Sequence, residues 1–281
     1  MIVKNLGGHS GCQILLMEEH GKSFVRKISS SLSYNKRLEE QSRKQSVYRN
    51  PEIHVPSVLN SGYTDDNLFF FDMEYVRGIS LSEYIQAIDV SKIDILVDII
   101  INNIVDIKES HTDNVAEIFS NKFSDLKTKL CDIPWANNGL LALDMLNSHD
   151  WSSFSHSICH GDLTLENIMI KGDDIYLIDF LDSFHDSWLL DLGKLMQDIE
   201  CMWSYRYHET DVNTIIRLRI FRDLLISKVQ AINPQILIEI YYALLLHLVR
   251  IYPYAKDTIT FDFLTNQTSR VMNTIHKLEG N

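Results

Sequence analysis

The order of strand-like and helix-like segments is the feature that most limits how this chain can fold. Residues 2–6, 13–17 and 23–28 are short apolar runs with Gly-containing connections, the pattern of an antiparallel meander. After Gly78 the apolar spacing becomes helical, except in a β-rich island at residues 157–180. Strands that precede helices, rather than alternating with them, predict an α+β fold.

Composition and charge exclude several classes of protein. The chain has 281 residues, of which 45% are hydrophobic and 23% charged, as in ordinary globular proteins. Its net charge of −12 argues against a general binder of nucleic-acid backbones, since such proteins need a basic face to displace counterions. We therefore expect no nucleic-acid partner.

The cysteines and the apolar stretches indicate a cellular compartment. The four cysteines show no CxxC spacing, so they predict neither a zinc site nor a redox pair, and free thiols suit a reducing cytosol. The most apolar stretch, residues 236–249, is interrupted by Glu239 and His247 and is shorter than the roughly 20 residues that cross a bilayer. We expect a cytoplasmic protein with no membrane insertion.

The strongest chemical signal lies in the β-rich island, where HGDLTLEN at residues 160–167 is followed by YLIDF at residues 176–180. Phosphoryl transfer from ATP needs a carboxylate that orients the acceptor hydroxyl, and oxygen ligands that hold Mg²⁺ against the phosphates. The pattern predicts Asp162 as the catalytic residue and Asn167 and Asp179 as the metal ligands. Each residue alone could merely cap a turn or end a strand, but their order around a predicted hairpin favours the catalytic interpretation.

This stretch resembles the catalytic core of the aminoglycoside phosphotransferase and choline kinase family, small-molecule relatives of the protein kinases. Gly161 is typical of that family, and Leu181 stands where a protein kinase has the glycine of D-F-G. Asp191, in WLLDLGKL, resembles the family's Asp-Leu-(Ala/Gly) helix start and is interpreted as a helix N-cap or a brace for the catalytic loop. The resemblance implies a two-lobed protein-kinase-like fold: a small antiparallel β N-lobe that binds nucleotide, residues 1–76, and a larger, mainly helical C-lobe, residues 77–281.

The resemblance also implies which residues contact the phosphates and the adenine of the nucleotide. The loop GGHSG falls between the first two strands, where the family covers the phosphates, so Gly8, Ser10 and Gly11 are expected to contact phosphate oxygens. The first β segment ends at the family's adenine-binding connector. There the backbone C=O of Glu74 and N–H of Val76 are expected to pair with adenine.

A lysine on the third strand completes the expected nucleotide site. Lys27 matches the residue that pairs with the α- and β-phosphates, and Arg26 should point to the opposite face because strand side chains alternate. A carboxylate on the following helix should orient Lys27. Glu39 and Glu40 are both candidates for this role. Glu40 is preferred because of its distance along the sequence to Pro56.

The expected function is ATP- and Mg²⁺-dependent transfer of the γ-phosphate to a hydroxyl of a small molecule: a sugar, an aminosugar, or an amino alcohol such as choline or ethanolamine. The acidic excess mildly favours a cationic acceptor. Asp182, His185 and Asp186 lie just past the metal ligand and could contact this acceptor or simply form a polar loop. Two alternatives remain, a protein kinase and a non-catalytic nucleotide-binding protein.

Overall fold

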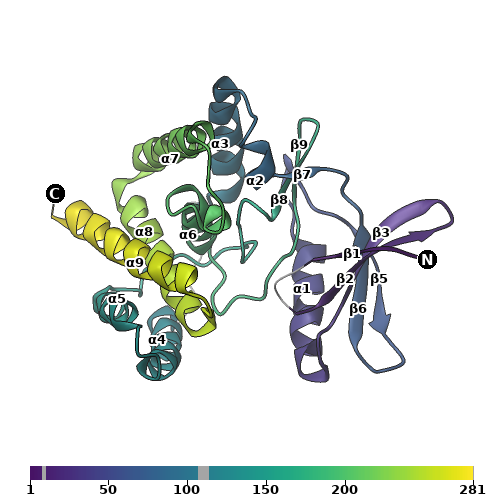
Figure 1. Cartoon of the computed structure of the whole chain (residues 1–281), viewed down its shortest axis with the longest axis horizontal. Helices are drawn as coiled ribbons and strands as arrows, with labels where there is room; N and C mark the ends of the chain where they lie inside the picture. Colours follow the sequence, from purple (N-terminus) through teal and green to yellow (C-terminus); the bar gives the residue numbers. More distant parts are fainter. Residues whose placement is uncertain (8–10, 107–113, 281) are drawn as a thin grey trace. The chain divides into compact units, whose positions relative to one another are not determined.

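The structure, a computed structural model, describes residues 1–7, 11–106 and 114–280 (Figure 1). The chain divides into two compact units. The β unit comprises Met1–Leu81 and Asn167–Asp182, and the helical unit comprises Ser82–Glu166 and Ser183–Asn281. The expected α+β fold, with a small antiparallel sheet near the N-terminus and a mainly helical remainder, is confirmed.

A five-stranded antiparallel sheet forms most of the β unit, in the order β1-β2-β3-β6-β5. Its strands are β1 (Ile2–Leu6), β2 (Gln13–Glu19), β3 (Lys22–Ile28), β5 (Val58–Tyr63) and β6 (Phe69–Glu74). His20 and Gly21 join β2 to β3 with φ angles of 50° and 74°. Two positive φ angles in a two-residue loop match the right-handed twist of paired strands, and this fixes the register of the hairpin.

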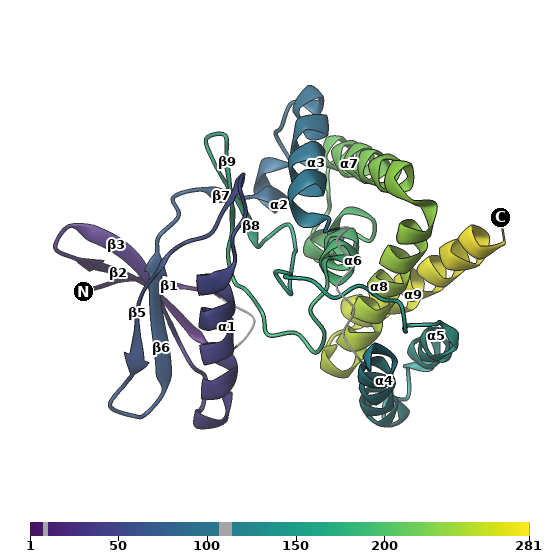
Figure 2. The same cartoon turned by 180° about the vertical axis from the view of Figure 1, so that it is seen from behind.

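Helix α1 (Asn35–Val47) packs against β6 beside this sheet (Figure 2). A short 3-10 turn, Leu32–Tyr34, leads into it. The small core between helix and sheet contains Val25, Leu38, Phe71 and Met73. α1 carries few apolar residues, so its inner face is completed by buried polar side chains.

A second sheet, in the order β4-β9-β8-β7, joins early and late parts of the sequence. Its strands are β4 (Ile53–His54), β7 (Ile79–Ser80), β8 (Ile168–Lys171) and β9 (Asp174–Leu177). β4 pairs in parallel with β9, and β7 pairs antiparallel to β8. Gly78 permits the approach, because a Cβ there would lie 2.5 Å from the carbonyl oxygen of Ile170.

Because of this pairing, the chain divides into its two units differently from the expected single boundary after residue 76. The hairpin at Asn167–Asp182 groups with the β unit, not with the helices that surround it in sequence. Lys44 of α1 donates to the carbonyl oxygen of Leu181 at 3.0 Å, and the ring of Tyr48 lies 5.1 Å from that of Phe180. The physical reason is that β8 and β9 find their backbone partners in β7 and β4, which belong to the first 81 residues.

The helical unit is built around α8, which contacts α5, α6, α7 and α9. Its helices are α2 (Leu81–Tyr84), α3 (Val90–Ile104), α4 (Val115–Cys131), α5 (Asn137–Ser148), α6 (Trp188–Ile199), α7 (Val212–Ile232), α8 (Pro234–Ile251) and α9 (Thr258–Glu279), with 3-10 turns at Trp203–Tyr205 and Tyr252–Tyr254. Side chains of Ser187, Asp211 and Asn233 cap α6, α7 and α8 by accepting from backbone N–H groups of the first turn.

One stretch in the described part of the chain, Pro234–Tyr254, has the length and mean hydropathy (1.5) of a membrane span. Within its most apolar 18 residues, 67% are buried by the rest of the structure, as in a core helix.

Candidate functional site

Lys27 is the most deeply buried cation of the β unit, with 1% of its surface exposed. Its Nζ donates to Oε1 of Gln41 at 3.2 Å and to the carboxylate of Asp179. Burying an ammonium costs free energy unless the group is paired and hydrogen-bonded, and Gln41 and Asp179 provide both interactions. The strand that carries the expected phosphate-binding lysine is thus connected to the hairpin that carries an expected metal ligand.

Arg26 occupies the opposite face of β3, as the alternation of strand side chains predicts. Its guanidinium donates to both carboxylate oxygens of Asp72, at 2.7 and 2.8 Å, and lies 4.2 Å from the centre of the Phe70 ring. Its hydrogen bond to the Asp72 carboxylate raises the pKa of Arg26. Arg26 is therefore fixed within the sheet, whereas Lys27 points toward α1 and the hairpin.

The expectation that Glu40 orients Lys27 is corrected by the structure, which places Gln41 there. Glu40 instead pairs with Arg43, at 2.7 Å, and Glu39 is exposed. One residue rotates a helix by about 100°, so Gln41 faces inward while Glu40, the residue before it, faces away from Lys27. A signal for Gln41 existed in the sequence: it lies three residues after the buried Leu38, on the inner face of α1.

Asn167 and Asp179 lie at the open end of the β8–β9 hairpin. The backbone C=O of Asn167 accepts from the N–H of Ile178 at 3.0 Å, continuing the register that pairs Ile168 with Leu177. Asp179 follows with a φ of 62°, a left-handed conformation that is uncommon outside glycine. The hairpin therefore brings the backbone of Asn167 next to that of the residue before Asp179.

This donor set fits Mg²⁺, which takes one or two protein oxygens and keeps its other positions for water and phosphate. Asp179 contributes a carboxylate to this set and Asn167 an amide oxygen. Among the described residues no group of three or more His, Cys, Asp or Glu side chains could hold a metal.

Asp162 lies in a loop of the helical unit whose backbone is held by a buried carboxylate. Asp191, 1% exposed, accepts from the N–H of His160 at 2.5 Å and from the N–H of Gly161 at 2.7 Å. Gly161 has a φ of 92°, which lets both N–H groups point toward one side chain. The interpretation of Asp191 as a brace for this loop is confirmed, and Ser187 is the N-cap of α6.

The carboxylate of Asp162 has a partner that the sequence did not suggest. Nζ of Lys194, in α6, lies 3.2 Å from Oδ1 of Asp162, and both side chains are largely buried, with exposed fractions of 18% and 23%. The only available signal was spacing, since Lys194 comes three residues after Asp191 and so lies on the same face of the helix.

A second carboxylate of α6 holds the far end of the loop. Asp198 is fully buried and accepts from the N–H of Leu165 at 2.8 Å, and from the N–H and hydroxyl of Ser204 at 3.0 and 2.8 Å. Burial raises the pKa of Asp198 to about 6, against the opposing effect of these hydrogen bonds. The loop is therefore attached to α6 at both of its ends.

The other expected nucleotide contacts stay predictions. Gly8 and Ser10 lie outside the described residues, whereas Gly11 has a φ of 75°, a turn conformation that suits glycine. Glu74 ends β6, where its carboxylate accepts from the N–H of Ser57 at 3.0 Å, and Val76 is half-buried in the connection to β7.

The residues weighed as acceptor contacts lie in a loop with internal partners. Nε2 of His185 bonds the carbonyl oxygen of Ser155 at 2.8 Å, and burial lowers the pKa of His185. Asp186 accepts from Sγ of Cys159 at 3.3 Å, and Asp182 is exposed. These contacts agree with the interpretation as a polar loop.

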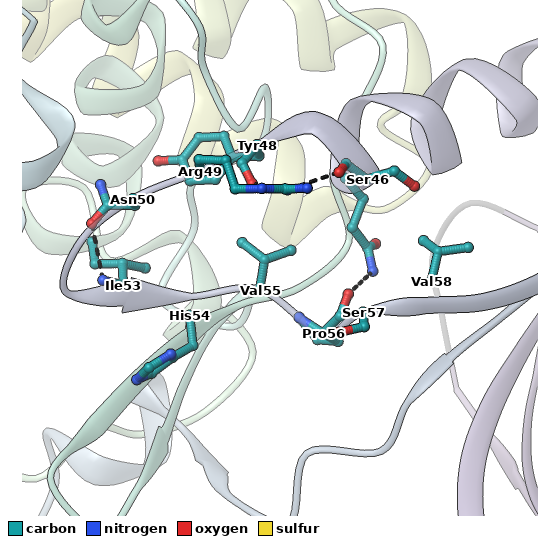
Figure 3. Close-up of a pocket in the computed structure, with 11 residues that line it drawn as sticks. Ser46, Tyr48, Arg49, Asn50, Ile53, His54, Val55, Pro56, Ser57 and Val58 are labelled. Carbon is teal, nitrogen blue, oxygen red and sulfur yellow. Dashed lines mark hydrogen bonds between the residues drawn. The ribbon is translucent and has the colours of Figure 1, made fainter.

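A cavity of about 380 Å³ lies between the end of α1 and the chain that leads to β5 (Figure 3). Arg49 borders it, but its guanidinium donates to the carbonyl oxygens of Ser46 and Tyr48 at the end of the helix. None of the expected site residues lines this cavity, so it adds nothing to the site.

Comparisons with known proteins agree with this geometry. The model of the phosphotransferase enzyme family matches residues 2–211. Aminoglycoside phosphotransferase APH(4)-Ia has a TM-score of 0.65 to this chain at 13% identity, covering 97% of this chain and 92% of its own. A putative fructosamine-3-kinase from Haemophilus somnus has a TM-score of 0.57 at 13% identity, covering 96% and 90%.

Two further structures are similar and hold nucleotides. A thermostable mutant of APH(4)-Ia, in ternary complex with ADP and hygromycin B, has a TM-score of 0.65 at 12% identity, covering 99% of this chain and 94% of its own. The GDP complex of a mutant aminoglycoside phosphotransferase of type IIIa has a TM-score of 0.62 at 14% identity, covering 100% and 93%. No curated protein matches the chain. These likenesses confirm the expected kinase-like fold, and with a family model that matches most of its length, the chain belongs to the phosphotransferase enzyme family.

Proposed function

We propose that this protein is an ATP- and Mg²⁺-dependent phosphotransferase whose acceptor is a hydroxyl of a small molecule: a sugar, an aminosugar, or an amino alcohol such as choline or ethanolamine. The observation that carries the proposal is the buried Lys27, which contacts Asp179 in a chain of the phosphotransferase family. A buried cation next to the carboxylate at the end of a hairpin is what binding of a triphosphate with its metal requires.

Each residue has a role that its surroundings support. Lys27 binds the α- and β-phosphates, and Gln41 holds its ammonium in place through a neutral hydrogen bond. Asn167 and Asp179 would hold Mg²⁺, which supplies positive charge to the triphosphate when bound. Asp162 orients the acceptor hydroxyl and receives its proton, and Asp191 keeps that loop in shape. Catalysis in this scheme is positioning and electrostatics rather than covalent chemistry by the protein.

The nucleotide and the compartment are proposed on separate grounds. Similar structures hold ADP in one case and GDP in another, which supports a purine nucleotide as donor. The four cysteines form no disulfide, and two of them, Cys159 and Cys201, are deeply buried, which suits the reducing cytosol. A small-molecule acceptor is favoured over a protein substrate, because the similar structures include a complex with hygromycin B and a putative fructosamine kinase.

The test is ADP release from Mg-ATP with a panel of choline, ethanolamine, hexoses, heptoses, aminosugars and aminoglycosides. We expect turnover on at least one compound, and a loss of about 10²–10⁴-fold in Asp162→Asn. Binding of Mg-ATP, measured separately by calorimetry, should survive in Asp162→Asn and weaken in Lys27→Ala. Nucleotide binding without turnover on any compound would favour a non-catalytic binding protein, and phosphorylation of a protein panel alone would favour a protein kinase.

A further inference from the structure

Three residues on one face of α6 each hold a different part of the loop at residues 160–165. Asp191 binds the backbone N–H groups of His160 and Gly161, and Asp198 binds that of Leu165. Lys194 lies between them in the helix, and its Nζ is 3.2 Å from the carboxylate of Asp162. Positions 191, 194 and 198 share a face because three to four residues make one helical turn.

The two outer residues fix the backbone, whereas Lys194 contacts a functional side chain. Its ammonium also lies 3.4 Å from Oε1 of Gln197, a residue that is fully buried on the same helix. The ammonium thus contacts the oxygen of a buried amide as well as that of Asp162. A lysine held in this way restricts the rotamers of the carboxylate that it binds.

A titratable group of α8 lies near Lys194. On α8, His247 lies close enough to Lys194 and to Arg250 for both positive charges to act on its imidazole. Nε2 of His247 contacts the carbonyl oxygen of Leu190 at 2.9 Å, and the pKa of this buried imidazole is lowered well below its usual value, which leaves it neutral. Lys194 is a cation in direct contact with the Asp162 carboxylate.

We propose that Lys194 is a positioning residue for the phosphoryl transfer, which aims the carboxylate of Asp162 at the acceptor hydroxyl. The inference rests on the proposed function, in which Asp162 is the residue that meets this hydroxyl. Small errors in the placement of reacting groups are costly, and displacement of about 1 Å can reduce a rate by about 100-fold. Loss of Lys194 should therefore lower kcat and leave the binding of Mg-ATP unchanged.

The experiment is a double-mutant cycle on kcat with the panel compound that turns over fastest. We expect Lys194→Met to lower kcat by about 10- to 100-fold with little change in KM for Mg-ATP, and Lys194→Arg to keep most of the activity. In the Asp162→Asn background, Lys194→Met should lower kcat little further, because the carboxylate that Lys194 positions is already absent. Lys228→Met is the matched control. Lys228 of α7 binds Asp94 and Asp98 of α3, at 2.9 and 2.8 Å, and its loss should leave kcat unchanged.

A structural role for Lys194 would give a different result. Its removal would then lower kcat by the same factor in the wild-type and Asp162→Asn backgrounds, with an equal drop in melting temperature, and this would overturn the inference. If Asp162→Asn itself keeps full activity, the proposed role of Asp162 fails instead. A crystal structure of Lys194→Met gives a measure independent of turnover: an Asp162 side chain in the same rotamer as in the wild-type crystal structure would also refute the inference.

Discussion

Replacing Gly193 by alanine tests a close contact between α6 and α8. An added Cβ at Gly193 would lie 2.6 Å from Cβ of Ala243, 2.9 Å from its carbonyl carbon and 2.9 Å from the nitrogen of Leu244. Two of these three atoms belong to the backbone of α8, so no change of rotamer relieves the overlap. The helices must move apart by about 1 Å to reach a normal carbon–carbon separation of roughly 3.5–4.0 Å.

Two opposing terms set the expected change in the free energy of unfolding. Alanine favours a helix over glycine by about 1 kcal/mol. Overpacking a filled core costs about 1–3 kcal/mol, and the upper end applies here because the obstacle is backbone. We therefore expect Gly193→Ala to destabilise the protein by about 2 kcal/mol. Since Gly193 lies between Asp191 and Lys194, movement of α6 should also reduce turnover.

Urea denaturation of four proteins separates the two terms: the wild type, Gly193→Ala, Ala243→Gly and the double variant. Ala243→Gly removes the methyl group at 2.6 Å but keeps both backbone contacts, so the double variant should be rescued only in part. If Gly193→Ala instead stabilises the protein by about 1 kcal/mol, helix propensity alone governs this position and the contact argument is refuted.

Three further predictions concern the groups that hold the site. Asp191→Ala should lower the free energy of unfolding by about 3 kcal/mol and abolish ADP release, because two loop N–H groups lose a charged acceptor; unchanged urea denaturation would contradict this. Gln41→Ala should weaken Mg-ATP binding in calorimetry while Glu40→Ala should not, and equal affinities of the two variants would show that Gln41 does not hold Lys27. Asp198 has a folded pKa of about 6, above the roughly 3.9 of an unfolded chain, so its contribution to stability is present below pH 4 and lost as pH rises through 6. Relative to Asp198→Asn, the wild type should be about 2 kcal/mol more stable at pH 4.5 than at pH 7.5 by urea denaturation, and a difference independent of pH would refute the raised pKa.

The sequence was most informative where function and structure depend on neighbouring residues. Asp162, Asn167 and Asp179 could be proposed together because a loop and a hairpin keep their spacing in sequence. Lys27 was chosen over Arg26 because it matches the family's lysine, and the alternation of strand side chains then predicted that Arg26 points the other way. The structure has the two residues on opposite faces of β3.

The contacts that were missed join elements distant in the chain. Gln41 was not found because α1 has few apolar residues, so the sequence gives little indication of its buried face. Lys194 was not found because its partner lies 32 positions earlier, and helix spacing alone shows which residues share a face, not what that face meets. The place of the β8–β9 hairpin was missed for the same reason, since its partners β7 and β4 are short, two-residue strands.

The pairing of β7 with β8 has a consequence for how the chain folds during synthesis. β4 and β7 are the two edges of the second sheet, and both emerge from the ribosome before its central strands exist. At about 5–20 residues per second, the stretch from Leu81 to Asp182 takes roughly 5–20 s to make. Ser80 and Met169 are nonetheless direct neighbours in the finished sheet, so residues 82–166 form an insertion between adjacent antiparallel strands. Synthesis of the β unit thus begins before that of the helical unit, and the β unit cannot be completed until the whole inserted segment, residues 82–166, has been translated.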